Sequence, residues 1–111
     1  MPNGMNNERM HEKLTVINEI VFSKHAVMDA IPSRHLDQNQ IEGILRAGED
    51  IVSIESQEDD VYRIHFVINK RRYFSITVKF LTTQKLKVIT VHYVSVKRFK
   101  RYQKWLQKKR R

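Results

Sequence analysis

Two histidines in the second half of the chain, His65 and His92, are the residues best suited to acid–base chemistry. Each lies in a stretch of alternating apolar and polar residues, which is typical of a β-strand, and a third such stretch between them carries Ser75. Imidazole titrates near neutral pH and can act as a general acid or a general base. If the three stretches are neighbouring strands, these three side chains form one candidate catalytic row.

The apolar residues of these stretches predict how the strands pair. Pairing Ile64 with Ile76, and Ile76 with Val91, places the large apolar residues of all three strands on one face. Directly opposed residues have Cβ atoms about 5 Å apart, so the two histidines are expected roughly 10 Å apart. The opposite face then carries four rows: His65, Ser75 and His92; Arg63, Thr77 and Thr90; Val61, Lys79 and Val88; Val67, Tyr73 and Val94.

The first two rows fit the cleavage of RNA without a metal ion. That reaction needs a base for the 2′-hydroxyl proton, an acid for the leaving oxygen and cations for the charge that develops on the phosphate. Arg63 and Lys79 can hold the phosphate, and Tyr73 can stack on a base. No carboxylate follows Asp60, so a carboxylate would have to reach these strands from the first half of the chain. The predicted catalytic residues are His65, Ser75, His92, Arg63 and Thr77.

The same residues have a plainer interpretation. One polar, solvated face is ordinary for an antiparallel sheet. A zinc site is a weaker hypothesis, because each zinc–nitrogen bond is roughly 2 Å long and two histidines on non-adjacent strands can both reach a metal only by leaning inward. Ser75 with His92 lacks the carboxylate that orients the histidine of a serine hydrolase. We therefore predict no metal site and no cofactor.

Positive charge is concentrated in the second half of the chain. The net charge is +9, yet residues 1–60 contain all twelve Asp and Glu residues, whereas residues 61–111 contain sixteen of the 21 Lys and Arg residues and no acid. Segregated charge makes a dipolar surface whose positive part attracts polyanions. We expect a nucleic-acid partner, with RNA favoured over DNA. The alternative is a basic tail on an otherwise neutral fold.

The most basic segment, residues 96–111, predicts an amphipathic C-terminal helix or tail. Phe99, Tyr102 and Leu106 lie on one side of it, among lysines and arginines that can neutralise phosphates. The same pattern also fits an anionic membrane surface or a calmodulin-type target. The predicted nucleic-acid-binding residues are Tyr73, Lys79, Lys97, Arg98, Lys100, Arg101, Lys104 and Lys108.

The other elements predict one α+β domain over residues 8–95, after a disordered segment of residues 1–7. Asp37 and Gln40 form the capping box of a helix that Gly48 ends. Helices followed by an antiparallel meander favour helices packed on one face of a three- or four-stranded antiparallel sheet. The expected helices cover residues 8–19, 23–31 and 37–47, and the expected strands cover residues 20–22, 51–55, 61–68, 72–81 and 86–94.

The chain contains no cysteine, no apolar run long enough to span a bilayer and no recognisable signal peptide. These features predict a cytoplasmic protein without a membrane partner.

Residues 22–26, Phe-Ser-Lys-His-Ala, resemble a small, largely uncharacterised bacterial and archaeal domain family that opens with an apolar strand and the motif F-S/T-x-H-A. Residues 34–37 stand where that family has R-G-I-S, and residues 88–93 resemble its last strand. Asp29-Ala30 replaces the family's Arg-Met pair, and Pro32 looks like an insertion. The family looks related to the RelE/ParE-like toxin fold, which includes metal-independent ribonucleases of toxin–antitoxin pairs.

This resemblance implies a sheet that faces RNA and a small acidic antitoxin protein as a partner. It also implies that His25 and Arg34 are site residues. The first hypothesis is therefore a toxin-type endoribonuclease. The second is a non-catalytic nucleic-acid-binding or regulatory module. The third is a protein-interaction domain whose acidic first half meets a basic partner.

Overall fold

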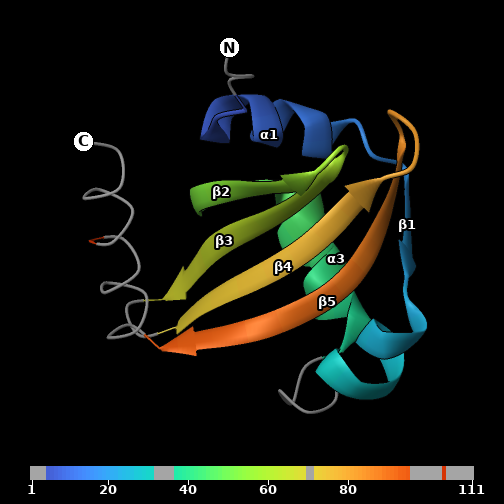
Figure 1. Cartoon of the computed structure of the whole chain (residues 1–111), viewed down its shortest axis with the longest axis vertical. Helices are drawn as coiled ribbons and strands as arrows, with labels where there is room; N and C mark the ends of the chain where they lie inside the picture. The colour runs from blue at the N-terminus through green and yellow to red at the C-terminus, as the bar shows by residue number, and fades with distance from the viewer. Residues whose placement is uncertain (1–4, 32–36, 70–71, 96–103, 105–111) are drawn as a thin grey trace.

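The computed structural model describes residues 5–31, 37–69, 72–95 and 104. Two α-helices, a π-helical turn and five strands make up this part of the chain, which confirms the expected α+β class (Figure 1). In chain order the elements are α1 (Asn7–Thr15), β1 (Glu19–Phe22), η1 (Ala26–Ala30), α3 (Gln38–Ala47), β2 (Ile51–Glu58), β3 (Val61–Asn69), β4 (Arg72–Phe80) and β5 (Lys85–Ser95).

The five strands form one mixed sheet in the order β1-β5-β4-β3-β2. The expectation of three or four antiparallel strands is therefore wrong, because the sheet has five strands and one of its pairs is parallel. The short apolar segment of residues 20–22 is part of a strand that pairs in parallel with β5, with Phe22 opposite Val88. At the other edge, β2 is antiparallel to β3 and continues to Glu58, beyond the expected end at residue 55.

The predicted register of the three central strands is confirmed over most of its length. Ile76 of β4 lies opposite Ile64 of β3 and opposite Val91 of β5. Ser75 accordingly lies between His65 and His92, as expected. The structure therefore contains the polar row that the alternation of apolar residues predicted.

The register of β5 differs from the prediction below Thr90. Val78 lies opposite Val88 rather than Ile89, because a β-bulge between Thr77 and Val78 leaves Ile89 as an extra residue. Val88 and Val91 are three residues apart, so strict alternation would place them on opposite faces. The bulge allows both to be fully buried. It also places Lys87, not Val88, opposite Lys79.

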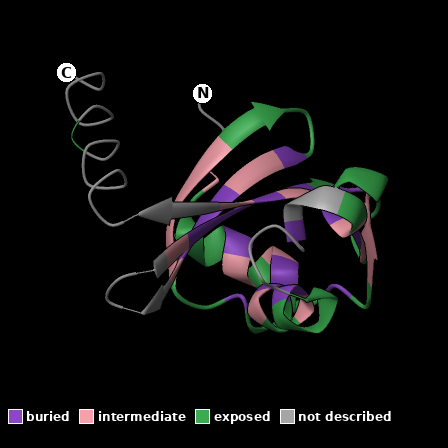
Figure 2. Cartoon of the chain, turned by 90° about the horizontal axis from the view of Figure 1, so that it is seen from below, coloured by how far each residue is buried: buried purple, intermediate pink, exposed green. Residues whose placement is uncertain are grey.

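The helices cover one face of the sheet, and the hydrophobic core lies between them. In Figure 2, buried segments run along the strands and along the turns of the helices that face them. Burying this apolar surface supplies the main driving force for folding. The core consists of Met10, Leu14, Ile17, Ala26, Ile31, Ile41, Leu45, Ile64, Phe66, Phe74, Ile76, Val78, Phe80, Leu86, Val88 and Val91.

Helix α3 begins and ends at the residues that the sequence predicts. Asp37 accepts a hydrogen bond from the Gln40 N–H at 2.8 Å, and the Gln40 side chain accepts from the Asp37 N–H at 2.9 Å. Gly48 adopts a left-handed conformation with φ of 60° at the C-terminal end. The helix after β1 is also capped as expected, because Ser23 Oγ accepts from the Ala26 N–H at 3.0 Å.

Helix α1 differs from its prediction at both ends. Asn6 caps it, so it starts at Asn7, one residue before the expected boundary of the disordered segment. It ends at Thr15 rather than residue 19, because Glu19 already pairs with Lys85 in the sheet. Within the described ranges, no helix has the length and apolar character needed to cross a membrane. The expected C-terminal helix of residues 96–111 lies outside the described residues, apart from Lys104.

The central core position Ile76 provides a test of this packing. Its side chain is fully buried, so Ile76→Ala is expected to lower the free energy of unfolding by about 2–5 kcal/mol. Urea denaturation followed by circular dichroism measures the change. Val16→Ala is the control, because Val16 is largely exposed and its truncation is expected to change stability by no more than about 0.5 kcal/mol. A loss at Ile76 no larger than the loss at Val16 would contradict this core.

Candidate nucleic-acid interface

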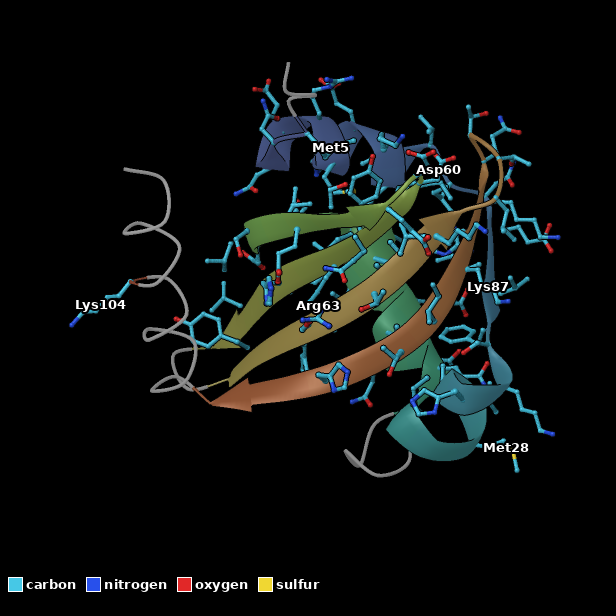
Figure 3. All side chains as sticks on the ribbon, viewed as in Figure 1. Met5, Met28, Asp60, Arg63, Lys87 and Lys104 are labelled. Atoms are coloured by element: carbon cyan, nitrogen blue, oxygen red, sulfur yellow. The ribbon has the colours of Figure 1, made fainter. Side chains whose placement is uncertain are left out.

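The face of the sheet that points away from α3 carries the candidate site. We call this surface the open face, and Figure 3 views it directly, with Arg63 projecting from it. The cross-strand pairs place His65, Ser75 and His92 in one row. The neighbouring row contains Arg63, Thr77 and Thr90. All five predicted catalytic residues therefore lie on this surface.

Burial divides these predicted residues into two groups. His65, Ser75 and Thr77 are only 5%, 2% and 8% exposed. The Arg63 side chain, in contrast, is 39% exposed, and His92 is half-buried. A substrate on this surface would meet Arg63 and His92 first. The plainer interpretation of the row as a freely solvated surface is wrong for Ser75, Thr77 and His65.

A carboxylate that the sequence did not single out, Glu55, joins the site from β2. It lies directly opposite Arg63 in the register, and its side chain is 25% exposed. Its Oε2 atom lies 2.8 Å from His65 Nε2 and 4.0 Å from Arg63 Nη1. Glu55 thus supplies the carboxylate from the first half of the chain that the second half lacks.

The alternation of residues 51–55 already contained a signal for Glu55. Ser53 and Glu55 flank Ile54, so both belong to one face of the predicted strand. Ile54 packs against the core, opposite Ile64, which turns its two neighbours toward the open face. The pairing of this strand with β3 was the missing information.

The hydrogen bond between Glu55 and His65 determines what each group can do. An ionised carboxylate only accepts hydrogen bonds. His65 Nε2 must therefore carry a hydrogen, and this N–H donates the hydrogen bond to Glu55. The buried ring of His65 therefore holds the carboxylate in place. Glu55, which reaches solvent, is better placed than His65 to take a proton from a substrate.

Hydroxyl groups line the floor of the open face between the charged side chains. The side-chain oxygens of Ser53, Ser75, Thr77 and Thr90 are buried, and none has a hydrogen-bond partner among the described residues. Arg63 Nε is in the same condition. Buried polar groups in folded proteins are nearly always paired with protein or water. These atoms lie too deep to contact a ligand directly, so contacts on this surface belong to the more exposed side chains around them.

The remaining predicted binding residues are distributed unevenly. Tyr73 is half-buried and lies opposite Val67, on the open face. Lys79 and Lys104 are exposed, and Lys79 lies on the open face. His25 lies in the helical segment after β1, outside both rows. The expected contacts at Arg34, Lys97, Arg98, Lys100, Arg101 and Lys108 fall outside the described residues.

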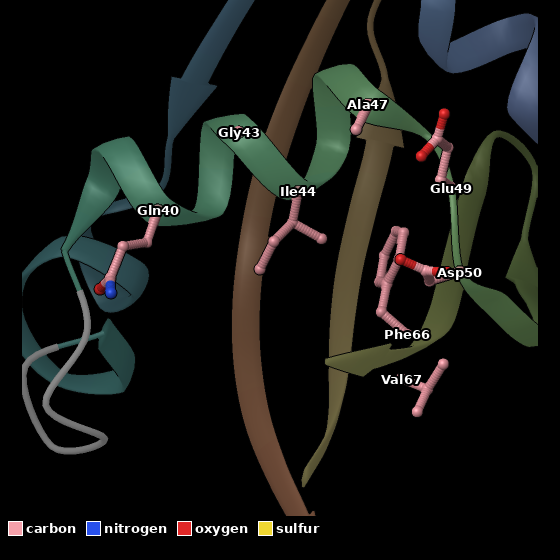
Figure 4. Close-up of a pocket in the computed structure, with 8 residues that line it drawn as sticks. All are labelled: Gln40, Gly43, Ile44, Ala47, Glu49, Asp50, Phe66 and Val67. Atoms are coloured by element: carbon pink, nitrogen blue, oxygen red, sulfur yellow. The ribbon is translucent and has the colours of Figure 1, made fainter. Parts of the chain in front are cut away.

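A hollow of about 360 Å³ lies beside α3 (Figure 4). Gln40, Gly43, Ile44, Ala47, Glu49, Asp50, Phe66 and Val67 line it. Its lining includes two carboxylates and no cation, so it would repel a polyanion. The charge of this lining is compatible with the hypothesis of a basic protein partner.

Within the described part of the chain, no three histidine, aspartate or glutamate side chains are grouped to hold a metal ion. No protein-family model matches the chain, and neither the curated proteins nor the solved structures contain a match. The functional assignment therefore depends on the geometry of the open face.

The contact between Glu55 and His65 predicts a measurable coupling. Removing either partner deprives the other of this hydrogen bond, so Glu55→Ala and His65→Ala are each expected to destabilise the fold. The double variant should lose less than the sum of the two, with a coupling of about 1–3 kcal/mol in urea denaturation. Glu42 and Arg46, an exposed pair on α3 at 3.4 Å, form the control cycle, with an expected coupling of about 0.3–0.5 kcal/mol. Equal couplings in the two cycles would contradict the role of His65.

Proposed function

We propose that the chain binds RNA on the open face of its sheet. The observation that carries this proposal is that two cations, Arg63 and Lys79, reach solvent on the same surface of the sheet. Arg63 and Lys79 are suited to contact phosphates, which supply most of the contacts in nucleic-acid complexes. Tyr73 at one end of the surface offers an aromatic ring to a base.

The finer fold assignment is part of the same proposal. Helices on one face of a curved sheet and a polar opposite face are what the resemblance to RelE/ParE-like toxins implies. In that case the partner in the cell would be a small acidic antitoxin, and the protein would act in the cytoplasm. The basic segment of residues 96–111 would add further phosphate contacts.

Binding can be tested with a fluorescently labelled octauridylate, using anisotropy across a salt series. Arg63→Gln is expected to raise the Kd about 10-fold or more, because a charge-assisted hydrogen bond to phosphate is lost. The matched control is Arg46→Gln, which removes the same charge from α3, where Glu42 already pairs with it. Octathymidylate measured in parallel compares RNA with DNA. Absence of affinity for both oligonucleotides at low salt would end the proposal.

A second function, RNA cleavage without a metal ion, is favoured by the position of Glu55. A carboxylate held by His65 and placed beside Arg63 is a suitable base next to a phosphate site. In the proposed reaction, Glu55 takes the proton of the 2′-hydroxyl, and the 2′-oxygen attacks the adjacent phosphorus. The bond from phosphorus to the 5′-oxygen breaks, and protonated His92 gives its proton to that oxygen. Arg63 binds the non-bridging oxygens.

This reaction yields a 2′,3′-cyclic phosphate and a free 5′-hydroxyl, which gel analysis of total RNA incubated in EDTA can detect. Glu55→Gln and His92→Gln are each expected to slow cleavage by about 10²–10⁴-fold. Glu55→Gln should bind octauridylate at least as tightly as the wild type, because a negative charge is removed from the phosphate surface. Inert wild-type protein that still binds RNA would leave the non-catalytic binding module as the function.

A further inference from the structure

Two lysines on the open face lie directly opposite each other in adjacent strands. Lys79 of β4 pairs with Lys87 of β5 across the antiparallel ladder, which brings their Cβ atoms to about 5 Å. Like charges in this position are destabilising unless something neutralises them. The two lysines are paired because the bulge at Ile89 shifts the register of the β5 residues that precede it by one position.

No described carboxylate neutralises the two ammonium groups. Every Asp and Glu side chain except that of Asp29 is described, and none lies within 4.0 Å of either lysine nitrogen. The nearby acid Glu19 lies 3.6 Å from Lys85 instead. The residues after Asp60, including those outside the described part, contain no acid at all. Among the described residues, these two cations therefore have no carboxylate counter-ion.

The neighbouring row places two threonines beside the lysines. Thr77 and Thr90 lie opposite each other, in the row next to that of the two lysines. Their side-chain oxygens are buried without a hydrogen-bond partner among the described residues, and Thr77 as a whole is 8% exposed. The two hydroxyls lie beneath the surface, so the two ammonium groups are the ones that can contact a tetrahedral oxyanion such as phosphate.

We propose that Lys79 and Lys87 bind a second phosphate of the RNA, next to the phosphate at Arg63. This inference rests on the proposed function. Thr77 lies opposite Arg63 in β3, and Lys79 is two residues further along β4, about 7 Å away. That spacing is close to the distance between neighbouring phosphates of an extended strand. The RNA therefore runs along the β-strands, and two consecutive phosphodiesters define the smallest ligand that fills both sites.

The test compares Lys79→Gln/Lys87→Gln with the wild type in binding to labelled octauridylate. Each cation that contacts a phosphate contributes about 0.7 to the slope of log K against log salt for a single strand. The double variant should therefore show a slope smaller by about 1.4 and weaker binding at low salt. Lys24→Gln is the matched control, because Lys24 is an exposed lysine outside the strands and its loss should leave the slope unchanged.

A length series locates the effect at one phosphate. For the wild type, the trinucleotide UpUpU should bind more tightly than the dinucleotide UpU, and the double variant should lose most of this difference. The variant should also unfold at the wild-type temperature or above it, because the repulsion between the two lysines is gone. Wild-type binding that Arg63→Gln weakens and the lysine variant does not would refute the second site alone. If the wild type binds no oligonucleotide, the proposed function fails together with the site.

Discussion

In the central strands, apolar and polar residues alternate, and successive side chains face opposite sides of the sheet. The pairing of the strands, and with it the position of every residue on the open face, depends on this alternation. Ile64, Ile76 and Val91 must all face the helices, and a shift by one residue would expose each of them. Once they are buried, the residues between them have no freedom of placement. His65, Ser75 and His92 are brought into one row on the open face as a consequence of core packing, whatever their chemical role.

The same constraint explains how much of the fold could be predicted from the sequence. Strong local signals, such as the capping box at Asp37 and the left-handed Gly48, fixed α3. The apolar alternation fixed the register of β3 and β4. The bulge at Ile89 was not predictable in this way, because Val88 and Val91 looked like ordinary members of one strand. The parallel pairing of β1 depends on contacts with β5 more than sixty residues away, and local patterns contain no information about it.

The site shows a related limit. The predicted row was correct, but residue types alone did not indicate that His65 would be buried and bonded to a carboxylate. The sequence did not single out Glu55, because it lies on the edge strand β2. Which strand pairs with an edge strand is decided by tertiary contacts and not by the local sequence. Its arrival changes the chemistry that the row can support. A histidine that donates to Glu55 acts as a support for that carboxylate, and proton transfer at a substrate then belongs to Glu55 and the half-buried His92.

Net charge alone is a poor guide to which cations can bind a polyanion. The count of sixteen basic residues after Asp60 suggests a uniform positive half, yet two acids from the first half reach the open face and occupy two of its cations. Glu55 lies beside Arg63, and Glu19 pairs with Lys85. The Arg63 side chain is still 39% exposed, whereas Lys79 and Lys87 have no described counter-ion at all. A phosphate that binds between these two lysines removes their mutual repulsion and is attracted by both. Its electrostatic binding free energy is therefore more favourable there than beside a cation that already has a carboxylate partner.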